Sequence, residues 1–302
     1  MTTSRIVVAT DFRTLSDTCV RLGAELGAAF HMETLLLHAT DLTELERTAA
    51  IPLGMQIAMD ALEERLRIRQ QKLQALLDSQ AETHGSLKGA VCHVRLVDDR
   101  PWHAIVQASK EPQTELLIIG SRGKHRSALE RTLGTTTERV VHDASKPVLV
   151  LHPDAFVPTL MGTHWIVGID FSPTSLEAAT YTAKLAKHTK GTLSLIHVLP
   201  FGQGRLEIDL GDQLEQQWTK SAHAELAEIA QRIGGVDHIQ VIPSNPELSA
   251  GQALCQACEK IDGAVLSISA GSHNTVSRVM LGSTANRCLR HATTPVLVVK
   301  NS

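Results

Sequence analysis

Glycine and threonine residues between positions 116 and 136 have the types and spacing expected of a phosphate-binding site. Residues 116–119 are apolar, as in a buried parallel strand, and Gly120 follows them directly. Glycines let backbone N–H groups approach an anion, and a helix start carries about half a positive charge. The candidate residues are Gly120, Gly123, Gly134, Thr135 and Thr136. They predict either a phosphate site at the carboxyl end of a strand or merely a strand end and a helix start.

The composition is that of a soluble globular chain long enough for two domains. Of its 302 residues, 43% are hydrophobic and 20% are charged, and the net charge of −3 gives no electrostatic basis for binding nucleic acid or an anionic membrane. No apolar run approaches the roughly 20 residues that span a bilayer, and no secretory leader is evident. Five cysteines in a chain of this length indicate reduced thiols. We therefore expect a cytoplasmic protein.

Buried strands and amphipathic helices alternate along the chain. The expected strands of the first half lie at residues 5–10, 34–39, 91–97, 116–120 and 147–151, with a long helix at 58–80 that Gly85 terminates. A further helix is expected at residues 102–110 and another at 137–144. This alternation is typical of a doubly wound parallel sheet.

The second half of the sequence repeats the first at fixed offsets. Residues that recur 159 positions later are Asp11 with Asp170, Phe12 with Phe171, Ser16 with Ser175 and His38 with His197. Residues that recur 148 positions later are Gly134 with Gly282 and Pro147 with Pro295. Constant offsets on either side of one deletion predict a tandem duplication of one α/β unit. The predicted domains are residues 1–152 and 163–302, joined by a linker at 153–162.

These ordered motifs resemble the universal stress protein family, and the resemblance covers both halves of the chain. It implies two tandem, doubly wound, Rossmann-like α/β domains, each with a five-stranded parallel sheet in the order 3-2-1-4-5, packed as a pseudo-two-fold dimer. The final strands, at residues 148–151 and 296–299, are apolar edges that need covering, so we predict that they pair with each other. A homodimer of the whole chain is a further possibility.

Nucleotide-binding members of that family hold ATP, and the resemblance implies where this chain would do so. In the first half, Gly120, Gly123, Gly134, Thr135 and Thr136 would lie at the phosphates, Asp11 near the ribose and adenine, and the backbone of Ala39 at the adenine edge. The second-half equivalents are Asp170, Val198, Gly282, Ser283 and Thr284. The implied ligand is ATP or another adenine nucleotide, with or without Mg²⁺.

The sequence departs from the family pattern in both halves. Ten residues separate Gly123 from Gly134, where the family has nine. In the second half, an ungapped repeat alignment places Ile268 opposite Gly120 and Gly271 opposite Gly123. Keeping the nine-residue spacing instead places Ser269 and Ser272 at the two glycine positions. Either way a glycine is lost, so we predict that the first half is the better nucleotide site.

A second group of residues suggests different chemistry. Cys255 and Cys258 form a Cys-x-x-Cys pair, and His223 with Glu225 lies upstream, in the order found in zinc deaminases. Leu254 occupies the place of the proline in that signature, and the repeat explains the surrounding strands without it. We expect the cysteine pair to be structural. His38 and His197 are expected to pack or to cap strand ends, not to bind metal.

The leading hypothesis is a stress-response protein that binds an adenine nucleotide as a regulatory ligand and is not an enzyme beyond weak ATP hydrolysis. The first alternative is a structural or interaction protein of the same fold that binds no nucleotide. The second is an enzyme, such as the zinc deaminase. The sequence contains no Gly-x₄-Gly-Lys-Ser/Thr motif, so P-loop phosphoryl transfer is not indicated. Its protein partners cannot be named from these residues.

Overall fold

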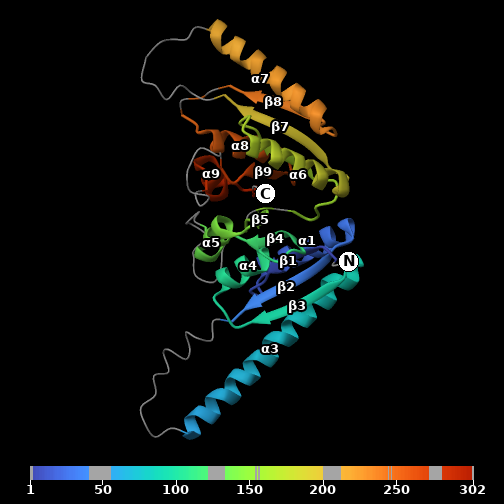
Figure 1. Cartoon of the computed structure of the whole chain (residues 1–302), viewed down its shortest axis with the longest axis vertical. Coiled ribbons are helices and arrows are strands. Elements are labelled where there is room, and N and C mark those ends of the chain that lie inside the picture. Colours follow the sequence, from blue (N-terminus) through green and yellow to red (C-terminus); the bar gives the residue numbers. More distant parts are fainter. Residues whose placement is uncertain are drawn as a thin grey trace. The chain divides into compact units, whose positions relative to one another are not determined.

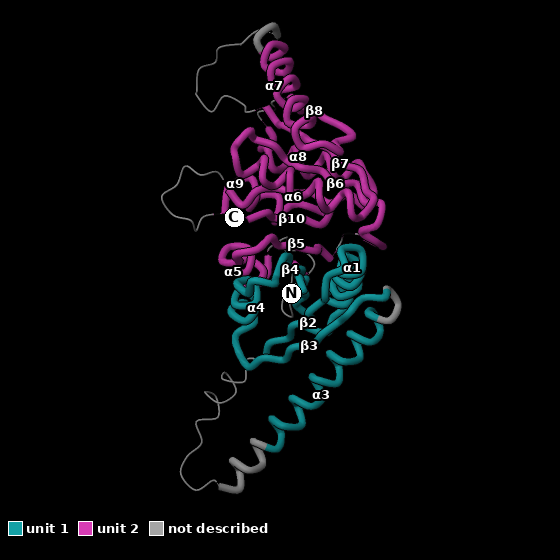
Figure 2. The backbone as a smooth tube through the Cα atoms, turned by 45° about the vertical axis from the view of Figure 1, so that its right-hand side comes forward, with its two compact units in different colours: residues 1–119 teal, residues 120–302 magenta. Residues whose placement is uncertain are grey.

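The computed structural model describes residues 3–40, 56–121, 133–153, 155, 157–199, 212–243, 245, 247–271 and 281–300. Within these ranges, the side chains of residues 56–63, 86–88 and 212–214 are not described. The chain forms two compact units, residues 1–119 and 120–302, which Figure 2 shows in teal and magenta. This division falls at the end of a strand and not at the linker expected at 153–162. The domain boundary at that linker remains a prediction.

Strands and helices alternate as the sequence predicts (Figure 1). In chain order, the elements of the first repeat are β1 (Arg5–Ala9), α1 (Thr14–Phe30), β2 (Glu33–Ala39), α3 (Gln56–Lys88), β3 (Cys92–Val97), α4 (Pro101–Ser109), β4 (Thr114–Gly120), α5 (Thr135–Asp143) and β5 (Val148–Leu151). Those of the second repeat are β6 (His164–Gly168), α6 (Pro173–Thr189), β7 (Thr192–Val198), α7 (Asp212–Ile233), β8 (His238–Ile242), α8 (Ala250–Glu259), β9 (Val265–Ser269), α9 (Ser283–His291) and β10 (Val296–Val299).

The first unit contains a parallel sheet in the order β3-β2-β1-β4. Its central strand β1 buries Ile6, Val7 and Val8 almost completely. Helices α1 and α3 pack against each other and against the sheet. Strand β5 continues this order, because the Ser121 amide just after β4 donates to the Leu151 carbonyl at 2.7 Å. The first repeat therefore has the predicted order 3-2-1-4-5.

The second unit contains the strand order β5-β10-β9-β6-β7-β8. Strands β5 and β10 pair antiparallel, with Leu149 opposite Leu297 and Val150 opposite Val296, and all four residues of each strand are buried. The prediction that the two final strands pair is confirmed. Leu149 and Leu297 are equivalent residues of the two repeats, so a pseudo-two-fold axis passes between them, as in an isologous interface.

The long helix of the first repeat differs from the prediction in its extent. Helix α3 continues through Gly85, and the chain turns instead at Gly89, whose φ is +66°. Gly85 has a packing role, since a Cβ there would lie 3.2 Å from the Cys92 Sγ and 3.3 Å from the Ala90 carbonyl oxygen. The expectation that Gly85 ends the helix is therefore wrong: the glycine allows β3 to pass close to the helix.

A lysine from the end of the second repeat binds a helix of the first. The Lys300 ammonium follows β10 and donates to the carbonyls of Val141 and His142 at the carboxyl end of α5. Burial lowers the pKa of Lys300 to about 8, and Asp143 opposes this effect only in part. The contact satisfies helix carbonyls that have no partner inside the helix.

We predict that Lys300 makes the free energy of unfolding rise with pH. Because its pKa falls from 10.5 to about 8 on folding, the unfolded chain binds more protons between these pH values, so the free energy of unfolding should rise with pH there. The slope should be up to about 1.4 kcal/mol per pH unit relative to Lys300→Met. Urea unfolding of both proteins from pH 7 to 10 measures this difference, and parallel curves would contradict the prediction.

Candidate functional site

Each repeat makes the same strained turn directly after its first strand. Phe12 follows β1 and Phe171 follows β6, and both have a φ of 63°, in the left-handed region. Such a backbone costs roughly 1–2 kcal/mol for a residue with a Cβ. The phenyl rings contact histidine rings at the ends of the next strands, with centroids 4.5 Å apart for Phe12 and His38 and 4.4 Å for Phe171 and His197. Because both repeats have the same geometry, the strained turn is a structural feature of the repeat itself.

The two histidines cap the ends of the first strands. The Nδ1 atom of His38 lies 2.7 Å from the Thr10 carbonyl oxygen, and that of His197 lies 2.7 Å from the Ile169 carbonyl oxygen. A carbonyl only accepts, so each Nδ1 carries the proton. The capping role expected from the sequence is confirmed.

This cap leaves the next backbone amide of each second strand exposed to a ligand. The parallel ladder on that side ends with the Thr10 amide donating to Leu37 and the Ile169 amide donating to Ile196. The next rung would join the Ala39 amide to the Thr10 carbonyl, but His38 occupies that carbonyl. Among the described residues, the amides of Ala39 and of its equivalent Val198 make no backbone hydrogen bond to the first strand.

Asp11 and Asp170 each use one carboxylate oxygen to fix the turn. Asp11 Oδ1 accepts from the Ser16 hydroxyl at 2.8 Å and from the Arg13 amide at 3.2 Å. Asp170 Oδ1 accepts from both the amide and the hydroxyl of Ser172. Burial raises the pKa of Asp170, but the hydrogen bonds from Ser172 and Ser175 outweigh it and hold the pKa below its usual range. The Asp170 carboxylate is thus ionised at neutral pH, and its other oxygen is left for a hydroxyl donor.

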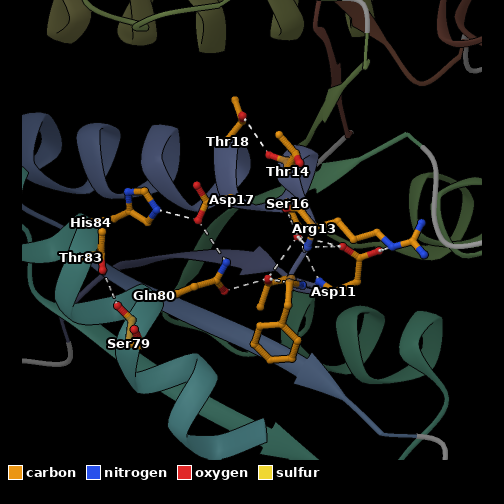
Figure 3. Close-up of polar contacts among 12 residues, drawn as sticks. Asp11, Arg13, Thr14, Ser16, Asp17, Thr18, Ser79, Gln80, Thr83 and His84 are labelled. Carbon is orange, nitrogen blue, oxygen red and sulfur yellow. Dashed lines mark hydrogen bonds and ion pairs between the residues drawn. The ribbon is translucent and has the colours of Figure 1, made fainter.

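The first repeat adds a polar network that the second lacks (Figure 3). The Thr10 hydroxyl donates to Gln80 Oε1 at 2.9 Å, and Gln80 Nε2 donates to Asp17 Oδ1 at 3.3 Å. His84 Nε2 lies 2.8 Å from the same Asp17 oxygen. These contacts join the long helix α3 to the turn that holds Asp11. In the second repeat, Ile169 replaces Thr10 and offers no hydroxyl.

The strand ends near the proposed phosphate position determine how the two repeats align. The amides of Ser121 and Ala270 donate to Leu151 and Val299, and their carbonyls accept from the amides of Gly134 and Gly282. The strand pairing gives the same alignment of the repeats, because Val7 lies opposite Leu117 and its equivalent Ile166 lies opposite Leu266. Ser121 therefore corresponds to Ala270 and Gly120 to Ser269. The alignment that preserves the nine-residue spacing is confirmed, and the one that places Ile268 opposite Gly120 is wrong.

The helix-start glycines do not serve the purpose expected of them. Gly134 and Gly282 have φ values of −64° and −60°, which any residue adopts. Their amides already donate, at 2.8 Å and 2.7 Å, to the preceding strand end. A Cβ on Gly282 would lie 3.3 Å from the Gly271 Cα atom, so close packing is the reason for glycine there. Neither of these two amides is therefore available to an anion, and the placement of the glycines at the phosphates stays a prediction.

The free donors are the amides of the next three residues in each repeat. The first bonds inside helices α5 and α9 run from the Glu138 and Asn286 amides to the glycine carbonyls, both at 2.9 Å. Within the described part of the chain, the preceding amides have no intrahelical acceptor. They belong to Thr135, Thr136 and Thr137 in α5, and to Ser283, Thr284 and Ala285 in α9.

The first repeat is better supplied with hydroxyl groups at this edge. Ser121 is 1% exposed, and its Oγ has no hydrogen-bond partner among the residues that the structure describes. The Thr137 hydroxyl donates to the Gly120 carbonyl at 2.8 Å and fixes the helix start against the strand end. The second repeat has Ala270 and Ala285 at these two positions. The site predicted from the sequence did not include Ser121 or Thr137, although both lie within the hydroxyl-rich segments that flank the predicted loop.

The structure distributes the predicted site residues over both units. Asp11 and Ala39 lie at the carboxyl ends of β1 and β2 in the first unit. The second unit holds Gly120, Gly134, Thr135 and Thr136 of the first repeat, and Asp170, Val198, Gly282, Ser283 and Thr284 of the second. Gly123 lies outside the described residues, as does Ser272.

The residues of the deaminase hypothesis do not assemble. His223 and Glu225 are on α7, whereas Cys255 and Cys258 are buried on α8. The described residues contain no group of three or more His, Cys, Asp or Glu side chains placed to hold a metal ion. These geometries give no support to a zinc deaminase.

The strand order and the groups at the carboxyl ends of the strands define a tandem pair of doubly wound α/β repeats with the topology of mononucleotide-binding domains. The model of the universal stress protein family matches residues 2–152 and, a second time, residues 162–300. The chain therefore belongs to the universal stress protein family, as the sequence motifs predicted. Among the described residues, no helix is both long enough and apolar enough to cross a membrane.

Known relatives share this tandem organisation. A universal stress protein of Mycolicibacterium smegmatis is 27% identical over 304 residues, which cover 98% of this chain and 96% of that protein. The crystal structure of a universal stress protein from Archaeoglobus fulgidus is 19% identical, with a TM-score of 0.67 and complete coverage of both chains. A putative universal stress protein from Pseudomonas aeruginosa gives 0.62 at 18% identity, over 99% of this chain and 93% of that one. At these identities the structural matches establish the fold.

We predict that the Gln80 network stabilises the first repeat. In Gln80→Leu, the Thr10 hydroxyl and the Asp17 carboxylate each lose a partner, so the free energy of unfolding should fall by about 1–2 kcal/mol. Gln74→Leu is the matched control, because Gln74 is on the same helix and its hydrogen bond to Asp78 is exposed. Its effect should stay within about 0.5 kcal/mol. If urea unfolding showed the same loss of free energy of unfolding for Gln80→Leu and Gln74→Leu, the Gln80 network would contribute no more than an exposed hydrogen bond.

Proposed function

We propose that this universal stress protein binds an adenine nucleotide, ATP in the leading case, as a regulatory ligand, and that the first repeat holds it. The observation that carries the proposal is the buried Ser121 hydroxyl, which has no hydrogen-bond partner among the described residues and lies one residue beyond Gly120. A buried hydroxyl without a hydrogen bond costs free energy, so it calls for an explanation. A phosphate oxygen accepting from it, beside the free amides of α5, provides one.

The remaining parts of a nucleotide have matching groups at the other strand ends of a repeat. A carboxylate that keeps one oxygen free, as Asp170 does, accepts from ribose hydroxyls. An unpaired amide at the end of the second strand, as at Ala39 or Val198, donates to a ring nitrogen of the base. The set contains donors for phosphate, an acceptor for ribose and a donor for the base, which supports a nucleotide over a simple anion.

The two repeats differ in a direction that favours the first. Ser121, Gly120 and Thr137 become Ala270, Ser269 and Ala285 in the second repeat. Each hydrogen bond to a charged group contributes about 1.5–3 kcal/mol, so losing one lowers affinity roughly ten- to a hundred-fold. The second repeat keeps the helix-start donors, the ribose acceptor and the Val198 amide but lacks the hydroxyl groups of Ser121 and Thr137, which makes it the weaker site.

One observation favours the second candidate function, an interaction protein that binds no nucleotide. Glu138 lies in the first turn of α5, where a negative charge opposes an incoming phosphate, and the equivalent residue in α9 is Asn286. Arg290 Nη2 lies 3.0 Å from Glu138 Oε1 and neutralises part of that charge. Retention of ATP by the purified chain separates the two functions, and mass spectrometry of ligands released from native protein detects it.

We predict that Ser121→Ala lowers the affinity for ATP without lowering stability. The hydroxyl has no partner within the described part of the chain, so its removal should leave the free energy of unfolding unchanged or slightly higher. Calorimetric titration with ATP, with and without Mg²⁺, should show a roughly ten- to a hundred-fold weaker site.

Ser283→Ala is the control for this titration, since it removes a hydroxyl at the helix start of the second repeat. It should leave the strong site unchanged. If Ser283→Ala abolished binding and Ser121→Ala did not, the second repeat would be the nucleotide site. If the unmodified chain bound no ATP, the interaction protein would be the better hypothesis.

A further inference from the structure

Three of the five cysteines gather where helices α8 and α9 cross. Cys255 and Cys258 belong to α8 and Cys288 to α9, and all three are buried, free thiols. The first repeat has no such cluster: its helix α4 contains no cysteine, and Val140 occupies the position of Cys288. The cluster is therefore a feature of the second repeat and independent of the nucleotide site proposed for the first.

The two helices approach closely at this crossing. A Cβ on Gly251 would lie 3.1 Å from the Thr284 carbonyl oxygen and 3.1 Å from the Arg287 Cβ, both shorter than an ordinary van der Waals contact, so glycine favours the close approach. Disulfide bonds need Cα atoms within about 4.4–6.8 Å, and close helix crossings at a glycine bring backbones toward that range.

The crossing brings the thiols of Cys255 and Cys288 together. Cys288 Sγ lies 3.6 Å from the Gly251 carbonyl oxygen. In a helix that carbonyl also receives the amide of Cys255, which lies one turn further along the same face. The pKa of each of these two thiols responds to the other, as that of neighbouring groups does, whereas Cys258 follows Cys255 by three residues on α8 itself. Cys288 is thus the neighbour of Cys255 on another helix.

The three thiols differ in reactivity. The hydrogen bond from Cys288 lowers the pKa of the Cys255 thiol and overcomes the opposing effect of burial. The pKa of Cys288 is raised by the same hydrogen bond and by burial, and that of Cys258 is raised by burial. Cys255 also retains 4% of its surface exposed, while the other two retain none. Since the thiolate is the nucleophile, Cys255 is the thiol that reacts first.

We propose that Cys255 and Cys288 are a redox-active pair that forms an intrachain disulfide between α8 and α9 when the protein meets hydrogen peroxide. The Cys255 thiolate attacks a peroxide oxygen, the O–O bond breaks, and a sulfenic acid and water result once the leaving hydroxide takes a proton. The Cys288 sulfur then attacks the Cys255 sulfur and loses its proton, the S–O bond breaks, and a second water leaves. Two thiols are oxidised and one peroxide is reduced to two waters.

The test uses the full-length chain under native conditions. The protein is treated with a slight excess of hydrogen peroxide, alkylated, digested without reductant and analysed by mass spectrometry. The expected result is a Cys255–Cys288 cross-linked peptide, a fall in free thiols from five to three, and full recovery with dithiothreitol. The oxidised protein should also melt at a higher temperature than the reduced one, because the bond closes a long loop of the chain.

Two variants distinguish the Cys255–Cys288 pair from the alternative pair of Cys255 with Cys258. Cys288→Val copies the residue of the first repeat, so it should fold, form no cross-link at Cys255, leave the Cys255 sulfenic acid without a resolving thiol and lose the shift in melting temperature. Cys258→Ser should still form the cross-link. A Cys255–Cys258 bond, a bond between chains, oxidation to sulfinic acid without a disulfide, or five unreacted thiols in the unmodified protein would each overturn the proposal.

Discussion

The antiparallel pairing of β5 with β10 is the contact on which the rest of the second unit depends. Each strand is four apolar residues long and would be an exposed, sticky edge if it stood alone. Pairing buries Val148–Leu151 against Val296–Val299 and brings the carboxyl end of helix α5 and the end of strand β10 close enough for the Lys300 contact. The final strand of the first repeat therefore belongs to the second compact unit, together with the strand that it pairs with.

The duplication has kept one part of the repeat and changed another. The Asp-Phe turn, its histidine cap and the unpaired amide beside it occur twice with nearly identical distances. At the edge proposed to hold phosphate, the repeats differ at Gly120, Ser121, Thr135, Thr137 and Glu138, and the cysteine cluster exists in only one of them. The conserved geometry suits a shared binding mode for the base and ribose, whereas the divergent edge suits separate tasks for the two repeats.

Much of this fold could be predicted from the sequence because strand alternation and repeat offsets depend on local residue types. The pairing of the final strands followed from their apolar edges alone. The alignment of β9 could not be fixed, because Ile268 and Ser269 both fit a short apolar strand and only the ladder with β6 and β10 decides between them.

Phosphate binding at this edge of the sheet remains a prediction, and the backbone donors available there differ from those expected. Gly134 was expected to offer its amide to an anion, yet tertiary contact with Ser121 uses that amide. The unsatisfied hydroxyl of Ser121 likewise depends on what packs around it, which no local pattern contains. Gly85 shows the same limit, since its role in helix α3 comes from a strand that approaches it later in the chain.

The contacts of Lys300 and Arg290 make the two repeats unlike partners. Lys300 binds the end of α5, but its equivalent in the first repeat is His152, whose shorter ring carries no ammonium group. Arg290 meets Glu138, but the equivalent residues His142 and Asn286 cannot form that ion pair. Two first repeats from different chains would meet across the same apolar strands with neither contact. The covalent link between the repeats is thus reinforced by a preference of each for the other, which disfavours the exchange of domains between neighbouring molecules in a crowded solution.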